Sequence, residues 1–328
     1  MISDENLEGY DRVGEIYYNP NVPLGTGAAG TVVCRGYFHK RYVAVKKYQR
    51  TLMSQMDNQM VKLLQADYHP NIVQYLGYAY KHDFCYLALQ LCQANLKQYV
   101  DDSYKNESLE LLSILKDILS GLSHLHNLSP AICHRDVKPT NCLIFAPNPT
   151  VKPIGVLSDL GLSKQLSGSN ETLTMSQAVG TNGYMAPELL DLDEEDNNTS
   201  SKVTIKIDIF SAGCLLYYAL TKGHNPFGNN PHLRNGNIVK NEFDLSKLEG
   251  NDKNFKSLIG KMISKEPDER PNADFVLESL CSPRILYSPK NDSEPTALKI
   301  DNEDDKGFGQ IEKQQKGTDN ESAPDEGT

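Results

Sequence analysis

The sequence predicts an α+β fold class in which a small antiparallel β lobe with one helix precedes a larger, mainly helical lobe. Short β-like runs around a glycine-rich turn occupy much of residues 12–91, whereas helical patterns with apolar residues on one face dominate residues 92–283. Strands followed by helices, without regular alternation, are typical of this class. At 328 residues the chain is long enough for each lobe to bury a core of its own.

The β lobe is predicted to begin with a strand-like run from Val13 to Tyr18 and a glycine-rich turn. Residues 24–33 read LGTGAAGTVV, so a β run follows the last glycine of a G-x-G-x-x-G spacing. In a dinucleotide-binding fold the same spacing opens a helix, which makes a hairpin the better interpretation here. Because glycines carry no side chain, backbone N–H groups in such a turn can approach phosphate oxygens closely.

A β run at residues 42–46 ends in Lys46, which follows the last glycine by 16 residues. A lysine at a strand end is usually an exposed edge residue, but its place after the glycine turn favours contact with nucleotide phosphates. Apolar residues at helical spacing then predict a helix over 52–66, and further strands are predicted at 72–79 and 84–91.

The helical lobe is predicted to start at residues 95–100 and to contain three apolar helices. Residues 108–126 carry leucine and isoleucine at helical spacing, so one face of this helix should lie in the core. Residues 208–218 are apolar nearly all round, which predicts a buried central helix. Residues 255–263 carry a third, amphipathic pattern.

The strongest functional motif is the run HRDVKPTN at residues 134–141, which Asp159 follows 18 residues later as the start of D-L-G. Asp136 can accept the proton of a hydroxyl group, and Lys138 can neutralise charge that develops on a phosphate. Asn141 and Asp159 offer the oxygen ligands that hard cations such as Mg²⁺ prefer. A polar loop with a few helix caps is the alternative interpretation, but a loop of that kind needs neither these residue types nor the correctly placed partner.

The charge composition bears on nucleic-acid binding and on the order of the two ends of the chain. The formal net charge of -10 argues against general nucleic-acid binding, which needs a basic face. The acidity is uneven, since residues 289–328 hold eleven Asp and Glu against five Lys. Residues 284–328 are therefore predicted to form an acidic disordered tail, and residues 1–11 a flexible N-terminus.

The chain is predicted to be cytoplasmic or nuclear, without a membrane segment. Its seven cysteines show no metal-ligand spacing and no C-x-x-C pair, which indicates reduced thiols in an intracellular compartment. The N-terminus is acidic and lacks the apolar core of a secretory signal. No run approaches the roughly 18 apolar residues that a membrane-spanning helix needs.

These motifs resemble those of the eukaryotic protein kinases, and the resemblance implies a bilobal protein-kinase-like fold with Mg²⁺ and ATP between its lobes. It implies that Lys46, Asp136 and Lys138 are catalytic, and that Asn141 and Asp159 bind the metal. The Lys138 position favours serine and threonine over tyrosine as acceptors. The residues that the resemblance assigns to nucleotide binding are Leu24, Gly25, Gly27, Gly30, Val32, Ala44, Lys46, Leu89, Cys92 and Leu143.

The same resemblance implies an activation loop between Leu162 and Tyr184, which ends before Ala186-Pro187-Glu188. Its candidate phosphorylation sites are Thr172, Thr174 and Ser176, although serine and threonine are also common loop formers. Arg135 is expected to pair with such a phosphate. Three further residues are interpreted as structural: Glu188 and Arg270 as an ion pair, and Asp208 as the support of the catalytic loop.

One position departs from the kinase pattern. In kinases a helix glutamate pairs with the strand lysine, but here Met60 occupies that position and no glutamate lies between residues 51 and 68. Misplacement of a catalytic group by about 1 Å can cost on the order of 10²-fold in rate. Two alternatives to an active, autophosphorylating kinase therefore stay open: a pseudokinase, and a scaffold whose dimerisation is gated by nucleotide.

Several stretches more specifically resemble the inositol-requiring unfolded-protein-response kinase–endoribonucleases. They are Val13–Ile16, Leu89–Cys92, Ala146–Pro149, Ala178–Glu188, Asp208–Cys214 with Tyr217 and Tyr218, and Asn225–Gly228. This resemblance implies a kinase acting on proteins and a possible homodimer, whereas the acidic charge predicts no nucleic-acid partner. No lumenal or transmembrane part precedes the kinase motifs and only a hydrophilic segment follows Leu280, so neither ribonuclease activity nor stress sensing is predicted.

Overall fold

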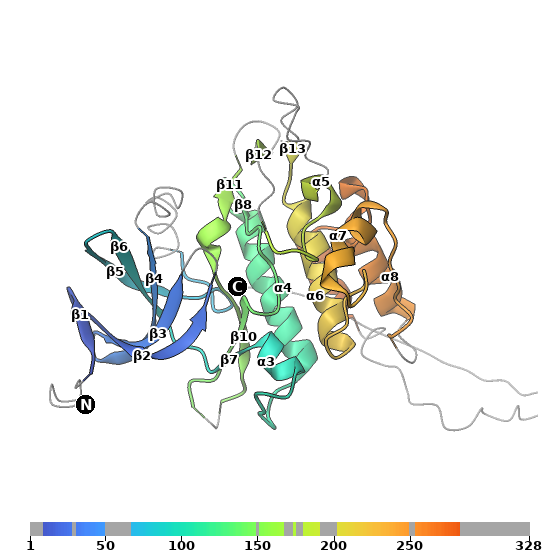
Figure 1. Ribbon diagram of the computed structural model, residues 1–328. Coiled ribbons are helices and arrows are strands. Elements are labelled where there is room, and N and C mark those ends of the chain that lie inside the picture. The colour runs from blue at the N-terminus through green and yellow to red at the C-terminus, as the bar shows by residue number, and fades with distance from the viewer. Residues whose placement is uncertain are drawn as a thin grey trace, which may run out of the picture. The chain divides into compact units, whose positions relative to one another are not determined.

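The computed structural model describes residues 9–27, 31–49, 67–148, 151–166, 173–174, 180–190, 202–248 and 253–282. As predicted, antiparallel strands come first and helices follow (Figure 1). The first six strands form one sheet in the order β1-β2-β3-β4-β6-β5, in which every pair is antiparallel. Their bounds are β1 Asp11–Val13, β2 Ile16–Thr26, β3 Val32–Phe38, β4 Arg41–Gln49, β5 Tyr75–Lys81 and β6 Phe84–Gln90.

The first predicted strand is in fact two strands. The run from Val13 to Tyr18 contains a turn at Gly14, whose φ of 59° lies in the left-handed region that favours glycine. Val13 pairs directly with Ile16 across this turn. The single β run was wrong because a glycine inside an apolar stretch closed a hairpin there. The predicted helix over 52–66 lies outside the described residues.

Alternation along β4 separates the core of the first lobe from a face that carries Lys46. Val43 and Val45 are fully buried in a cluster with Ile16 and Cys34. Since successive side chains of a strand point to opposite faces, Ala44 and Lys46 lie on the other face of the sheet. The sheet therefore presents the lysine on the face opposite to this core.

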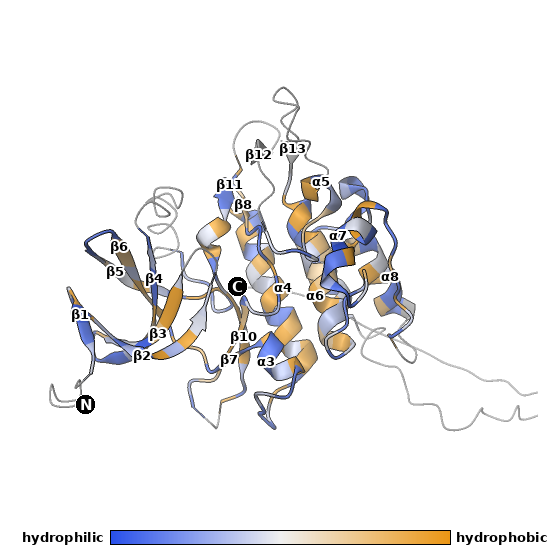
Figure 2. Cartoon of the chain, in the orientation of Figure 1, coloured by the Kyte–Doolittle hydropathy of each residue, from blue (hydrophilic) through white to orange (hydrophobic). Residues whose placement is uncertain are grey.

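The second lobe is built around two helices, α4 (Leu111–Asn127) and α6 (Lys206–Leu220). Figure 2 shows orange, hydrophobic residues along both helices, with blue, hydrophilic ones among them on α4. As predicted, α6 is buried nearly all round. The remaining helices are α3 Leu96–Val100, α5 Pro187–Leu190, α7 Pro231–Val239, α8 Lys253–Met262 and α9 Ala273–Cys281, with 3₁₀ turns at Leu160–Leu162 and Pro267–Glu269. The short strands are β7 Ala94–Asn95, β8 Ile132–Cys133, β9 Cys142–Phe145, β10 Ile154–Leu157, β11 Lys164–Gln165, β12 Leu173–Thr174 and β13 Lys202–Val203.

Helix α4 passes very close to the backbone at Asn71, which precedes β5. Asn71 accepts a hydrogen bond from the Leu157 N–H at 2.8 Å and donates its side-chain amide to the Gly155 carbonyl at 2.9 Å. A Cβ atom on Gly121 of α4 would lie only 2.4 Å from the Asn71 carbonyl oxygen. The helix can pass this backbone only because residue 121 has no side chain.

Replacing Gly121 with alanine should therefore destabilise the protein, although alanine favours helix by up to about 1 kcal/mol. Overpacking against backbone atoms that cannot rotate away costs about 1–3 kcal/mol. The matched control is Gly236→Ala in α7, where nothing lies within 4 Å of the added Cβ. Urea unfolding should show a loss of stability for Gly121→Ala and no loss for Gly236→Ala. Equal stability of the two variants would contradict the close approach.

All seven cysteines lie within the described residues, and none of them forms a disulfide. Among the described residues, no helix combines the length and apolar character required to cross a lipid bilayer. The cytoplasmic or nuclear location and the domain limits at residues 12, 91 and 283 stay predictions.

Candidate active site

The backbone of the loop at residues 134–141 is fixed by hydrogen bonds to Asp208, in the first turn of α6. Its carboxylate accepts the backbone N–H of His134 at 2.7 Å and that of Arg135 at 2.7 Å. His126 of α4 adds a third hydrogen bond, from Nε2 at 2.9 Å. Burial raises the pKa of Asp208, but the His126 hydrogen bond and nearby charges outweigh it, so the pKa lies below its usual value. Asp208 is thus a buried anion that fixes the loop backbone, including Arg135 at a φ of 70°.

Both oxygens of the Asp136 carboxylate accept hydrogen bonds. Asn141 donates its amide nitrogen to Oδ2 and to the backbone carbonyl of Asp136, both at 2.9 Å. Lys138 Nζ lies 2.7 Å from the same Oδ2. The Thr181 hydroxyl donates to Oδ1 at 2.6 Å and itself accepts from Lys138 Nζ at 2.7 Å. The three residues together fix the direction in which the carboxylate faces.

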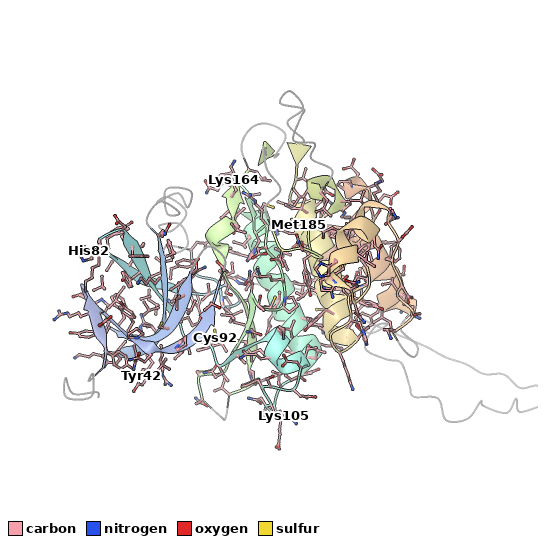
Figure 3. All side chains as sticks on the ribbon, viewed as in Figure 1. Tyr42, His82, Cys92, Lys105, Lys164 and Met185 are labelled. Carbon is pink, nitrogen blue, oxygen red and sulfur yellow. The ribbon has the colours of Figure 1, made fainter. Side chains whose placement is uncertain are left out.

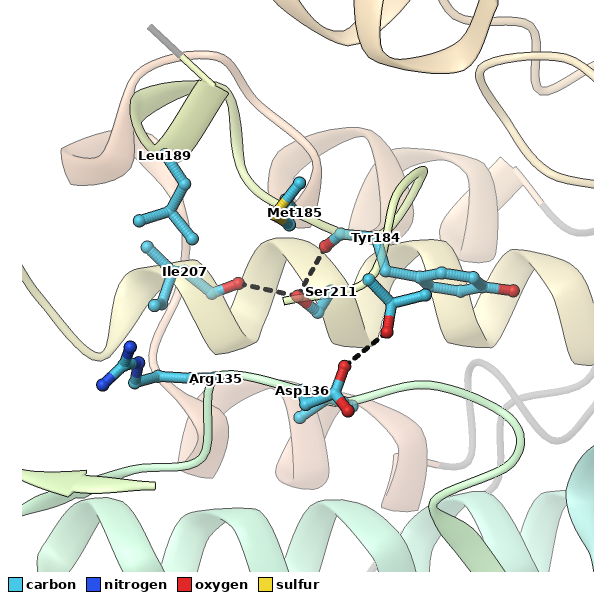
Figure 4. A pocket seen from close by; sticks show the side chains of 9 residues that line it. Arg135, Asp136, Tyr184, Met185, Leu189, Ile207 and Ser211 are labelled. Atoms are coloured by element: carbon cyan, nitrogen blue, oxygen red, sulfur yellow. Dashed lines mark hydrogen bonds between the residues drawn. The ribbon is translucent and has the colours of Figure 1, made fainter. Parts of the chain in front are cut away.

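Thr181 is a site residue that the sequence analysis did not assign. It stands 45 residues after Asp136, in a stretch that was interpreted only as the end of a loop. The available signal was the Gly180-Thr181 pair ahead of Ala186-Pro187-Glu188. Figure 4 shows this stretch against the catalytic loop, with the Tyr184 carbonyl tied to Ser211 of α6 at 2.6 Å.

Lys46 of β4 reaches across to Asp159, which follows β10, and the two side chains form an ion pair. Asp159 has a φ of 63°, so its backbone is in the left-handed region as the chain enters the following 3₁₀ turn. Burial raises the pKa of Asp159, but the Lys46 ammonium outweighs it and holds the pKa below its usual value. The lysine is therefore anchored by Asp159, while Met60 lies outside the described residues.

Four predicted nucleotide-binding residues gather where the first sheet meets the second lobe. Ala44 of β4 is paired directly with Leu89 of β6, which places the two on the same face. Ala44, Cys92 and Leu143 are only partly buried at the edge of the main apolar cluster, and Cys92 stands just after β6 (Figure 3). An aromatic base fits an edge of this kind, and the contact of these four residues with adenine stays a prediction.

The glycine-rich turn is described only in part. Leu24 is 46% exposed and Gly25 pairs with Val33 at the end of β2. The Gly27 N–H closes the turn by donating to the Thr31 carbonyl at 2.8 Å. Gly30 lies outside the described residues.

Val32 does not occupy the predicted place. Its side chain packs against the core of the first lobe, on the face opposite to Lys46. The residue paired directly with Lys46 is its neighbour Val33, which therefore shares the face of the lysine. β3 and β4 pair in one unbroken register from Val32 to Phe38, so the alternation along β3 turns Val33 to the face of Lys46 and Val32 away from it. A nucleotide contact through Val32 stays a prediction that this pairing does not favour.

Arg135 points to a different part of the site. Its Nε is buried and has no hydrogen-bond partner among the described residues, and burial lowers the pKa of its guanidinium. An unpaired buried donor is consistent with an anion arriving from elsewhere, as the predicted phosphate would. Of the predicted phosphorylation sites, Thr172 and Ser176 lie outside the described residues, and Thr174 ends β12, which pairs with β13.

The predicted pair of Glu188 and Arg270 is present. The guanidinium donates to both carboxylate oxygens, at 2.6 and 2.8 Å. It also donates to the carbonyls of Ser264, Lys206 and Lys265. The pair therefore ties the start of α5 to the segment between α8 and α9.

Comparison with known families gives this arrangement a context. The protein kinase domain family matches residues 18–280. The chain belongs to the protein kinase family. The match includes both the sheet that carries Lys46 and the loop that carries Asp136.

The similar proteins are longer than this chain, and two of them are named as both a kinase and an endoribonuclease. The chain is 40% identical over 281 residues to the human serine/threonine-protein kinase/endoribonuclease IRE2, across 84% of this chain and 30% of that protein. It is 38% identical to serine/threonine-protein kinase/endoribonuclease ire-1 of Caenorhabditis elegans, across 82% of this chain and 28% of the relative. It is 34% identical to the Schizosaccharomyces pombe protein named sensor for unfolded proteins in the ER ire1, across 83% and 27%. The chain thus spans less than a third of each of these relatives.

Protein kinases use Mg²⁺, and the donors in this kinase domain suit that ion. The side-chain amide nitrogen of Asn141 donates both of its protons to Asp136. The side-chain oxygen Oδ1 of Asn141 is therefore left to face a cation. Asp159 adds a carboxylate whose lowered pKa keeps it ionised. An amide oxygen and a carboxylate are hard ligands, and Mg²⁺ commonly takes only one or two protein groups beside phosphate oxygens and water.

Proposed function

We propose that the chain is a protein serine/threonine kinase that transfers the γ-phosphate of ATP to protein hydroxyl groups, including those of its own activation loop. The observation that carries this proposal is the fixed carboxylate of Asp136, gripped by Asn141, Lys138 and Thr181. Lys46 and Asp159 complete the set from the other side. A set of this composition supports in-line phosphoryl transfer, which depends on positioning and charge more than on covalent chemistry.

Each residue has a defined task in this mechanism. Asp136 orients the acceptor hydroxyl and takes its proton, while Lys138 stabilises charge on the transferred phosphate. Lys46 holds the nucleotide phosphates, and leaves part of its contact with Asp159 to do so. Asn141 and Asp159 hold Mg²⁺, which supplies neutralisation of phosphate charge when bound.

The proposal is tested by radiolabelled phosphate transfer from ATP to the chain itself and to a generic protein substrate. Labelling should require Mg²⁺ and should disappear when the metal is removed with a chelator, because the two oxygen ligands then hold no cation. Acid hydrolysis of the product should release phosphoserine and phosphothreonine. Nucleotide binding without any labelling would favour the pseudokinase alternative and overturn the kinase.

Thr181→Val tests whether the hydrogen bond from Thr181 positions the Asp136 carboxylate. The variant keeps the side-chain shape but removes the hydroxyl that links Asp136 to Lys138. Hydrogen bonds to charged groups contribute about 1.5–3 kcal/mol, so kcat should fall by about 10- to 100-fold with little change in the KM for ATP. Thr140→Val, an exposed site in the same loop, is the matched control and should keep its activity. Equal losses in both variants would remove Thr181 from the site.

Only the kinase part of the relatives' names is extended to this chain. Ribonuclease activity and the sensing of unfolded proteins are not part of the proposal. Homodimerisation in the presence of nucleotide is retained from the family resemblance, and sedimentation with and without Mg²⁺-ATP tests it. A mass that stays monomeric in both conditions would count against the dimer.

A further inference from the structure

Arg234 lies beside the catalytic loop and forms no ion pair with any residue that the structure describes. Arg234, in the first turn of α7, lies along Gly183, because a Cβ on that glycine would meet Arg234 Cδ at 2.7 Å and Nη1 at 3.5 Å. Gly183 has a φ of 81° and follows Thr181 by two residues. Arg234 thus flanks the segment that contacts the carboxylate of Asp136.

The guanidinium of Arg234 is fixed by carbonyl groups. Its Nε donates to the Gly228 carbonyl at 2.7 Å and its Nη2 to the Asn229 carbonyl at 3.3 Å. No carboxylate in the described part of the chain forms an ion pair with it. Since a guanidinium has five N–H groups, these two bonds orient the cation and leave donors for another partner.

The backbone beside this cation is fixed on both sides. Asn235 of α7 accepts the Gly183 N–H at 3.0 Å, and Asn225 donates to the Gly183 carbonyl at 3.0 Å. Two residues span at most about 7 Å of chain, so Gly183 cannot lie far from Thr181 and its hydrogen bond to Asp136. The guanidinium of Arg234 is therefore close enough to meet a side chain a few residues from an acceptor hydroxyl that binds at Asp136.

Two lysines of this region, Lys97 and Lys138, already have acidic partners. Lys97 of α3 forms an ion pair with Asp101 at 2.9 Å, and Lys138 with Asp136 at 2.7 Å. Burial raises the pKa of Tyr218, and Arg234 opposes that rise, as it does for Tyr184. Arg234 is thus close enough to act on both phenols, and it is the cation of this group without an acidic partner among the described residues.

We propose that Arg234 forms an anion subsite of the substrate-binding surface, which takes an acidic or phosphorylated side chain a few residues from the acceptor serine or threonine. This inference rests on the proposed kinase function and adds the class of substrate. An arginine held in place by its neighbours loses little side-chain freedom when it binds a carboxylate or a phosphate bidentately.

The experiment measures kcat/KM for peptides with one acceptor serine and a single variable position, placed in turn at each of the four residues on either side. The variable residue is glutamate, phosphoserine, glutamine or lysine, so that carboxylate and phosphate are tested separately. At the position that meets Arg234, the wild type should prefer glutamate or phosphoserine to glutamine by about 5- to 30-fold. Arg234→Gln should abolish this ratio and Arg234→Glu should reverse it in favour of lysine.

A ratio between peptides within one variant is not affected by loss of folded protein. The control is Lys240→Gln, an exposed residue that caps the other end of α7, which should keep both its activity and the acidic preference. Wild-type turnover that is equal for all four residues at every position would overturn the subsite while leaving the kinase intact. The absence of phosphorylation of every peptide, together with no autophosphorylation, would instead overturn the proposed function.

Discussion

Replacing Asp136 with asparagine is expected to lower phosphate transfer by about 10²–10⁴-fold, the usual contribution of a general base. Asparagine has nearly the same volume and keeps one oxygen to face the acceptor hydroxyl, but its amide cannot take up the proton. The contacts that reach this position come from Asn141, Lys138 and Thr181. These three residues are unchanged in the variant, so nucleotide binding should be retained. Radiolabelled transfer and the Kd for Mg²⁺-ATP are the two measurements.

The matched control is Asp102→Asn, at an exposed position after α3, which should transfer phosphate at the wild-type rate. Equal labelling by wild type and Asp136→Asn would contradict the kinase mechanism, since the signal would then come from a contaminating enzyme or from another base. A wild type that binds nucleotide but transfers nothing would favour the pseudokinase or scaffold alternatives.

The contacts within the catalytic loop were predictable because their residues are local in the sequence. Asp136, Lys138 and Asn141 lie within one loop, so their mutual contacts follow from a few peptide units of chain. The type and order of the main elements were also accessible, because the apolar patterns of α4 and α6 continue over 17 and 15 residues. The period of 3.6 along α4 and the length of the apolar run in α6 both favour a helix over a strand.

The contacts that the sequence did not reveal depend on the folded chain. Thr181 reaches Asp136 across 45 residues and His126 reaches Asp208 across 82. Neither distance in sequence indicates which side chains will meet. The face of Val33 has another cause, since it is set by the register of β3 with β4, in which Val33 stands opposite Lys46. Motif spacing alone does not report that register.

Breaking the ion pair of Glu188 and Arg270 should destabilise the protein strongly because the cation is completely buried. The Arg270 side chain is 0% exposed and that of Glu188 is 20% exposed. Two charges in such a place are costly to remove from water, and the pair offsets that cost through two short hydrogen bonds. Removing only one partner leaves the other charge buried without compensation.

Glu188→Gln is therefore expected to lower the free energy of unfolding by about 3–5 kcal/mol, the usual effect of breaking a buried pair. The chain supplies its own control in Lys152 and Glu110, a pair at 2.8 Å whose side chains are 54% and 64% exposed. Glu110→Gln should change the stability little, since water screens an exposed pair. Urea unfolding of both variants measures the difference. Similar losses would show that the three carbonyl groups around Arg270, rather than the carboxylate of Glu188, compensate its charge.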